Sequence, residues 1–351
     1  MIGLDYTVTP VDQVNVRPFS CEAVIKNTGG SPQSAILKYD VTGSATYSGS
    51  SLATVLASGD SIIVAATPTF SPGIGNYVVE MWAEADSAGA GLVTTNSAIE
   101  TRNIEVSQYL YAKDEGAANQ AGAYAVGDVD DQNQISTRYE IYANADLYSL
   151  RVFIDDGSTV GSKIYAVIYE ADSTASNGVF FLDQSDDYTL TAQDLGNWVD
   201  VTFSNPISLF AGYAYECGVG GYQHPIDISE VGMTANPALY NGEHSLFDVT
   251  GLSTQSAGTP TWYYITSTPM VRMNFDPNID IATARMQGVG ATVTITGIVT
   301  NGDELGQIRY IEDATGGLAL YDSALVGVVR GDEITVSGIL VDYNGLLEMT
   351  P

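Results

Sequence analysis

The stretch IRYIEDATGGLALYD, residues 308–322, reads as two β-strands joined by a tight turn. The Asp-Ala-Thr-Gly-Gly run contains residue types that turns favour. This stretch therefore predicts a β-hairpin. Elsewhere along the chain apolar and polar residues alternate, and a period of two places successive side chains on opposite faces of a sheet.

Composition favours the same class of structure over the full 351 residues. The chain contains 36 Gly and 22 Tyr but only 12 Lys plus Arg, which suits many short strands with frequent turns. No stretch shows the period of an amphipathic helix of useful length. We therefore expect an all-β protein, long enough for two or three domains.

Residues 1–107 form the first expected domain. The runs CEAVIKN, SIIVAATPTF and NYVVEMWAEAD are separated by Gly, Ser and Pro, as in a β-sandwich. Gly59-Asp60 precedes a strand, an aromatic-Pro-Gly turn follows at Phe70 to Gly73, and Tyr77 begins a Tyr-containing strand. This region resembles bacterial CARDB-type, immunoglobulin-like modules, which implies an Ig-like β-sandwich.

Residues 108–277 form the second expected domain. KIYAVIYE reads as a strand, and WVDVTFSNPISLFAG reads as two strands joined by a turn at Asn205-Pro206. With the closing run TWYYITSTPMVRMNF, the segment resembles jelly-roll modules of large secreted proteins from Bacteroidetes-type bacteria. The resemblance implies a jelly-roll-like β-sandwich, used as an accessory part beside adhesion or carbohydrate-binding modules and upstream of a type IX secretion tail.

Residues 278–351 form the third expected domain, which resembles bacterial extracellular OB-fold modules. The order is a strand, the YIEDATGG strand and turn, LALY, and then GDEITVSGILVDYNGLLEM. Val293, Ile295, Ile334 and Val336 are expected inside the barrel. Gly297 and Gly338 are expected at its bends, because a strand glycine often marks a bulge or corner. The final run, LLEMTP, is short, so we expect a partial, truncated OB-fold barrel within a larger protein.

The formal net charge is −30 at pH 7. Such a surface repels phosphate and anionic lipid, so the sequence predicts no nucleic-acid partner. Solubility and attraction of divalent cations are both compatible with this charge, and both interpretations stay open. No run of about eighteen apolar residues occurs, which predicts no membrane span. The start, MIGLDYTVTP, lacks the features of a signal peptide.

Aromatic side chains are the candidate ligand-binding groups. Tyr310, Tyr321 and Tyr343 lie on the expected OB-type strands, where aromatic rings can stack on bases or sugar rings. The alternative is that these tyrosines pack on their own barrel. Trp262 and Trp198 are further candidates for sugar platforms, with core packing as the alternative for both.

Asp128, Asp130 and Asp131, in GDVDDQNQ, are the candidate metal ligands. Calcium prefers six to eight oxygen ligands, and a loop of Asp and Asn can supply them. The spacing does not match the EF-hand loop. The weaker cluster in DQSDDYTL consists of Asp183, Asp186 and Asp187. A solvated acidic turn is the alternative, and structural calcium is the cofactor to test first.

Catalytic signatures do not emerge from the sequence. His224 and His244 are the two histidines, without a recognisable nucleophile elbow, an H-E-x-x-H motif or paired zinc cysteines. Cys21 and Cys217 each lie in an apolar run, so we expect two buried free thiols. The sequence therefore predicts a protein that is not an enzyme.

The function expected from these observations is that of a non-catalytic, extracellular or cell-surface protein with a structural, adhesive or filament-forming role. Its partners would be other copies of itself, other cell-surface proteins or polysaccharide. Two alternatives stay open: carbohydrate-binding accessory modules of a secreted hydrolase, and an accessory region of an extracellular nuclease.

Overall fold

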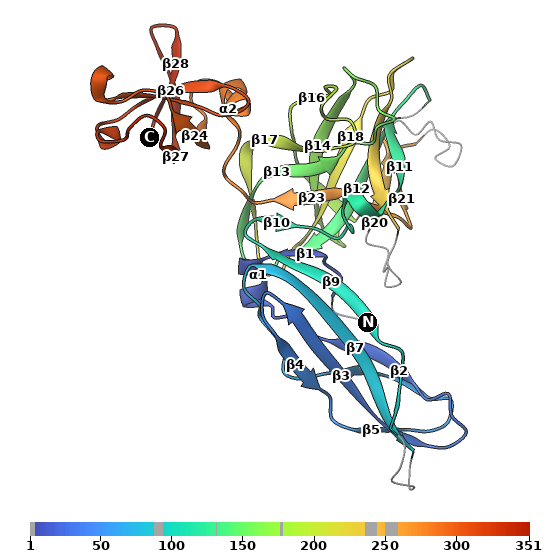
Figure 1. Cartoon of the computed structure of the whole chain (residues 1–351). Coiled ribbons are helices and arrows are strands. Elements are labelled where there is room, and N and C mark those ends of the chain that lie inside the picture. The colour runs from blue at the N-terminus through green and yellow to red at the C-terminus, as the bar shows by residue number, and fades with distance from the viewer. Residues whose placement is uncertain (1–3, 88–93, 131, 176–177, 236–243, 250–258) are drawn as a thin grey trace. The chain divides into compact units, whose positions relative to one another are not determined.

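The computed structural model describes residues 4–87, 94–130, 132–175, 178–235, 244–249 and 259–351 (Figure 1). These residues form many β-strands and two short α-helices, which confirms the all-β prediction. They fall into two compact units. The first comprises Met1–Val201 and Ser208–Asn274, and the second comprises Thr202–Ile207 and Phe275–Pro351. The predicted division into three domains stays a prediction.

The N-terminal region of the first unit contains strands β1 to β9 and helix α1 (Val11–Val16). Its larger sheet has the order β1-β9-β7-β3-β4, with β5 beside β3 and β8 beside β7, and β2 pairs with β6 in a second sheet. The strand bounds are β1 (Val8–Pro10), β2 (Glu22–Lys26), β3 (Gln33–Gly43), β4 (Tyr47–Ser50), β5 (Thr54–Leu56), β6 (Ser61–Ala65), β7 (Gly75–Ser87), β8 (Thr94–Asn96) and β9 (Glu100–Ser107).

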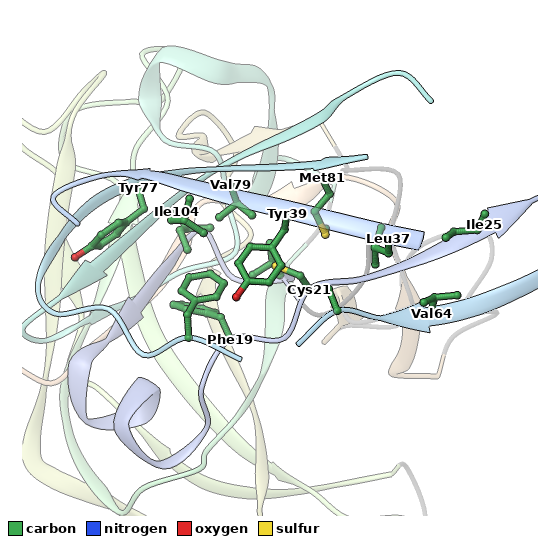
Figure 2. Close-up of a cluster of buried hydrophobic side chains, with 14 of the residues drawn as sticks. Phe19, Cys21, Ile25, Leu37, Tyr39, Val64, Tyr77, Val79, Met81 and Ile104 are labelled. Carbon is green, nitrogen blue, oxygen red and sulfur yellow. The ribbon is translucent and has the colours of Figure 1, made fainter. Parts of the chain in front are cut away.

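Alternation along the strands builds the core of this region. On β3, Leu37 and Tyr39 are each 1% exposed, whereas the side chains between and beside them are more accessible. Figure 2 shows Tyr39 gathered with Phe19, Cys21 and Met81 in the interior. The Tyr39 hydroxyl donates a hydrogen bond to the carbonyl oxygen of Pro68 at 2.6 Å. The polar end of this buried ring is thus satisfied, as burial requires.

A central region contains β10 to β23, arranged in three sheets, and it lies in the first unit except for residues 202–207. Their orders are β10-β23-β13-β17, β11-β19-β22, and β15-β14-β18-β12-β20-β21 with β16 also beside β14. The bounds are β10 (Leu110–Tyr111), η1 (Ala117–Asn119), β11 (Gln120–Gly127), β12 (Asn133–Glu140), β13 (Ala145–Phe153), β14 (Lys163–Ala171), β15 (Val179–Gln184), β16 (Tyr188–Thr189), β17 (Trp198–Leu209), β18 (Ala214–Gly221), β19 (Ser229–Thr234), β20 (His244–Asp248), β21 (Thr261–Tyr264), β22 (Thr268–Pro269) and β23 (Val271–Asn274).

Strand β17 corrects one sequence-based expectation. The predicted turn at Asn205-Pro206 is wrong, because both residues lie inside the single strand β17. β17 is the last strand in the order of its sheet among the described residues, and Pro206 is exposed. An edge strand tolerates proline, since the missing N–H faces no neighbouring strand.

The second unit contains a closed five-stranded barrel in the order β24-β25-β26-β28-β27. The sequence predicted a partial, truncated barrel, and this prediction is wrong because the ring of strands is closed. β28 closes the ring because it pairs antiparallel with β27 and parallel with β26. The bounds are α2 (Ile281–Gln287), β24 (Thr292–Val299), η2 (Asp303–Leu305), β25 (Ile308–Glu312), β26 (Gly317–Tyr321), η3 (Ser323–Leu325), β27 (Glu333–Tyr343) and β28 (Leu346–Thr350).

The barrel core agrees with the predicted inward positions. Val293 and Ile295 are 6% and 0% exposed, and the half-buried Ile334 and Val336 pack against the same core. Gly338 allows β28 to approach closely, because a Cβ there would lie 2.4 Å from the carbonyl oxygen of Thr350.

Helix α2 was not predicted. Ile281 and Ala284 are buried against the barrel core, and the Asp280 carboxylate caps the helix by accepting from the backbone amide of Thr283 at 2.7 Å. With seven residues, the helix is too short to show a clear period, although Asp at its N-cap is a typical start signal.

Candidate functional site

Tyr310 and Tyr321 lie side by side on the outer surface of the barrel. In the antiparallel pair β25–β26, Tyr310 is opposite Ala319 and Tyr321 is opposite Ile308. The two tyrosines are therefore diagonal neighbours on one face, with Cα atoms about 7 Å apart by sheet geometry. Tyr310 is 37% exposed and Tyr321 is 46% exposed. Neither ring is buried in the barrel, so both are available to a ligand.

Tyr343 is exposed but does not belong to this pair. It pairs with Leu346 across the turn that joins β27 to β28, and β28 separates it from β26. Asn344 and Gly345 form the turn with φ of 54° and 87°, and the Asp342 carboxylate accepts from the Gly345 amide at 3.0 Å. Two left-handed central residues are typical of a two-residue hairpin turn.

The charges of the barrel are arranged against an anionic ligand. Residues 278–351 contain three arginines and ten carboxylates. Arg309 is fully buried, and its guanidinium donates to the carbonyl oxygens of Gly306, Ile308 and Val328 and to the Asp303 carboxylate. A cation held by these acceptors is not available to a phosphate chain. The aromatic face thus lacks the basic groove that single-stranded nucleic acid requires.

Trp262 packs among other aromatic rings of the central region. Its ring stacks on Phe247 at 4.7 Å between centroids and meets the edge of Tyr169 at 5.3 Å. Tyr169 lies on β14 and Trp262 on β21, four strands apart in the sheet order. A flat sheet would separate these strands by about 19 Å, so the ring contact requires a strongly curved sheet. One face of Trp262 is thus already covered by Phe247.

Trp198 is also engaged by the protein itself. The guanidinium of Arg272 lies 4.1 Å from its ring centroid, and the same guanidinium donates to both carboxylate oxygens of the buried Asp114. This cation–π contact holds the ring in a structural assembly. The sequence left two interpretations open for Trp198, core packing and a sugar platform, and core packing agrees better with these contacts.

The predicted calcium ligands follow β11. Asp128 accepts from the Asp130 backbone amide at 2.8 Å, which is the arrangement of an Asx turn, and Asp131 lies outside the described residues. In the weaker cluster, Asp183 accepts from the Gln184 amide, whereas Asp187 binds Tyr222 and Lys163. Over the described ranges, no three His, Cys, Asp or Glu side chains converge in a way that could hold a metal ion. Calcium remains a prediction.

The two histidines have different surroundings. His244 is 4% exposed, and burial, followed by the nearby Lys113, lowers its pKa to about 3, so it is neutral at pH 7. Its Nε2 lies 3.2 Å from the Thr268 hydroxyl. His224 is exposed and lines a pocket with Lys163 and Tyr222. No sequence motif singled out this pocket, since its residues meet only through long-range strand pairing.

Both cysteines are free and buried, as the sequence predicted. Burial raises the pKa of Cys21 to about 12 and also raises that of Cys217. Thiols in such surroundings stay protonated and are poor nucleophiles.

No family model matches this chain, and no curated protein matches it. The resemblances to CARDB-type, jelly-roll and OB-fold modules therefore stay predictions. Among the described residues, none of the helices has the length and apolar character needed to cross a bilayer.

Proposed function

We propose that this chain is a non-catalytic, extracellular adhesive protein, and that its barrel binds polysaccharide through Tyr310 and Tyr321. The exposed, adjacent position of these two rings on β25 and β26 is the observation that carries the proposal. The extracellular setting rests on the sequence resemblance to secreted bacterial modules.

The strand order supports the proposed OB-type ligand face. β25 and β26 are the second and third strands of the closed barrel, and the face of strands two and three is where OB-folds bind oligonucleotides and oligosaccharides. Two neighbouring rings offer a flat apolar surface to the C–H face of a sugar ring. Tyrosine hydroxyls add hydrogen-bonding capacity at the rim of this surface.

Charge favours a saccharide over nucleic acid as the occupant. The exposed Glu312 lies on the same strand and the same face as Tyr310. Arg285 donates to the carbonyl oxygen of Gly317, and Arg330 lies 3.6 Å from Glu304. This surface does not repel an uncharged polysaccharide, whereas its carboxylates repel a phosphate chain. An accessory role beside a nuclease is disfavoured for the same reason.

The test uses the full chain and a panel of soluble xylan, mixed-linkage β-glucan, amylose, galactan and alginate, with and without calcium. We expect one or more uncharged polysaccharides to bind. The double variant Tyr310→Ala/Tyr321→Ala should bind at least about tenfold more weakly, since stacking on one aromatic ring contributes roughly 1–3 kcal/mol. Tyr264→Ala is the matched control, because Tyr264 is 73% exposed and lies in the other unit. Unchanged binding by the double variant would refute the proposal.

Self-association is a second candidate function, favoured by strand β15. β15 is the last strand in the order of its sheet within the described residues. Phe180, Phe181 and Leu182 are 48%, 58% and 39% exposed on it. An exposed apolar edge strand is a template for pairing with another chain. This arrangement would allow copies to assemble through β-strand addition.

Sedimentation and negative-stain microscopy of the native protein test this second candidate. We expect concentration-dependent oligomers that Phe180→Lys and Leu182→Lys abolish, because a charge on an edge strand opposes pairing. Val160→Lys is the control, since Val160 is an exposed apolar residue outside the strands. Monomers at all concentrations would contradict self-association through β15.

A further inference from the structure

A pocket of about 460 Å³ lies in the central region, apart from the barrel tyrosines. Lys163 begins β14, Asp187 precedes β16, and Tyr222 and His224 follow β18. Ile164 is paired with Gly221 across β14 and β18, so Lys163 and Tyr222 lie at the same end of neighbouring strands. The volume is in the range of small-molecule sites.

Three side chains of the pocket form one hydrogen-bonded group. The Lys163 ammonium donates to Asp187 Oδ2 at 3.1 Å, and the Tyr222 hydroxyl donates to Asp187 Oδ1 at 2.6 Å. The hydrogen bond from Tyr222, together with Lys163, lowers the pKa of Asp187. Burial, reinforced by Asp187, raises the pKa of Tyr222. At neutral pH the group therefore holds a carboxylate, a protonated phenol and an ammonium.

His224 and Asp227 form a second group in the lining of the pocket. The backbone amide of Asp227 donates to His224 Nδ1 at 3.0 Å. A neutral imidazole whose Nδ1 accepts carries its proton on Nε2, so the ring offers an N–H donor there. The same Nδ1 also lies 3.0 Å from the Asp227 Oδ2. The pocket lining thus contains both hydrogen-bond donors and acceptors.

The charge balance selects the class of ligand. Among the described residues that line the pocket there is one ammonium, Lys163, and there are two carboxylates, Asp187 and Asp227. Lys163 is already neutralised by Asp187, so an anionic ligand would face the remaining negative charge. A ligand rich in hydroxyl groups suits the site, because each hydroxyl can donate to a carboxylate and accept from an ammonium or N–H.

One aromatic ring adds a place for the apolar side of such a ligand. Tyr222 is 36% exposed, and its ring contacts the buried Tyr165 at 5.2 Å between centroids. The Tyr165 hydroxyl accepts from Gln134 at 3.1 Å, which fixes the ring beneath Tyr222. Tyr222 is therefore held in place by a packed neighbour on one side and Asp187 on the other. A sugar presents both a C–H face for such a ring and hydroxyl groups for the polar lining.

We infer that this pocket is a second binding site, which takes an uncharged mono- or disaccharide. The site is independent of Tyr310 and Tyr321, because its residues belong to the other unit of the chain.

The probes are D-glucose, D-galactose, D-mannose, N-acetyl-D-glucosamine and D-glucuronate, added to the full chain and followed by saturation-transfer NMR and calorimetry. We expect at least one uncharged sugar to bind and glucuronate to bind more weakly. Lys163→Met and Tyr222→Ala should each weaken that binding by about tenfold or more. Lys38→Met is the matched control, since Lys38 forms a surface ion pair with Glu84 in the N-terminal region.

Each result bears on the inference. No binding of any uncharged sugar, preferential binding of glucuronate, or unchanged binding by both pocket variants would overturn it. The Tyr310→Ala/Tyr321→Ala chain separates the two sites, because it should retain binding of the small sugar while losing binding of the polysaccharide to the barrel. If that chain binds polysaccharide normally, the barrel proposal fails and the pocket stands.

Discussion

The guanidinium Nε of Arg309 donates to the carbonyl oxygen of Val328 at 2.8 Å, inside the barrel wall. The same side chain bonds the carbonyl oxygens of Gly306 and Ile308, so it joins the segment before β25 to the segment before β27. Asp303, which is mostly exposed, supplies the countercharge. A buried arginine surrounded by acceptors is thus a structural brace rather than a ligand-binding cation.

Replacing Arg309 by methionine should destabilise the barrel by roughly 2–3 kcal/mol, since the hydrogen bonds of a buried charged group are lost. Hydrogen exchange of the amides of β25 and β26 in the full chain would report the loss. Arg285→Met is the matched control, because Arg285 is exposed and its guanidinium donates to the carbonyl oxygen of Gly317. Equal exchange in the two variants would contradict the assigned role of Arg309.

Gln13 in helix α1 should matter for the stability of the first unit. Its Nε2 donates to the Ala143 carbonyl oxygen at 2.8 Å, and its Oε1 accepts from the amides of Tyr142 and Ala143 at 2.7 and 3.0 Å. Gln13→Leu leaves these groups without partners, at a cost of about 2–3 kcal/mol. Urea denaturation followed by tryptophan fluorescence would measure it, since all three tryptophans lie in this unit.

Thr9→Val is the substitution to compare with Gln13→Leu. Thr9 is 5% exposed and its hydroxyl has no hydrogen-bond partner among the described residues, so the nearly isosteric valine should be neutral or stabilising. A loss of stability similar to that of Gln13→Leu would show that burial alone, and not hydrogen bonding, explains both effects.

His244 should make the folded protein sensitive to acid. Its pKa falls from an ordinary value of 6.5 to about 3 in the fold, chiefly through burial. Above pH 6.5 both states are neutral and the group has no effect. As the pH falls from 6.5 toward 3, only the unfolded state takes up the proton, so stability is lost at up to about 1.4 kcal/mol per pH unit.

The difference in unfolding free energy between the unaltered chain and His244→Gln separates the effect of His244 from that of the carboxylates. In urea titrations at pH 7, 6, 5 and 4, the unaltered chain should lose stability faster than the variant on acidification. His224→Gln, which removes the exposed histidine, is measured beside it as the control for loss of an imidazole. A difference that stays constant over this pH range would rule out the buried neutral state of His244.

Cys21 and Cys217 should resist alkylation in the native protein. Burial raises the pKa of both thiols, and the thiolate is the reactive form. Mass spectrometry after iodoacetamide treatment at pH 8 should find both unmodified in the folded protein and both modified in urea. Rapid labelling of either cysteine without denaturant would contradict the observed burial.

Short-range patterns in the sequence determined the strands. The run KIYAVIYE, which begins at Lys163, is the single strand β14, whose residues 164–169 are all buried. The hairpin expected at residues 308–322 is present as β25 and β26. The expected inward positions Val293 and Ile295 are buried for the same reason. A period of two is a property of the extended backbone, so it is visible wherever one face of a strand is covered.

The tertiary structure alone decided which residues meet. Arg309 is buried, and the carbonyl groups that accept from it belong to residues 306, 308 and 328. Asn205-Pro206 reads as a turn, yet its place in the edge strand β17 allows the chain to continue straight through it. Lys163, Asp187 and Tyr222 form a pocket only because β14, β16 and β18 are neighbours. Burial, strand order and convergence depend on pairings between distant segments, and local alternation carries no information about those partners.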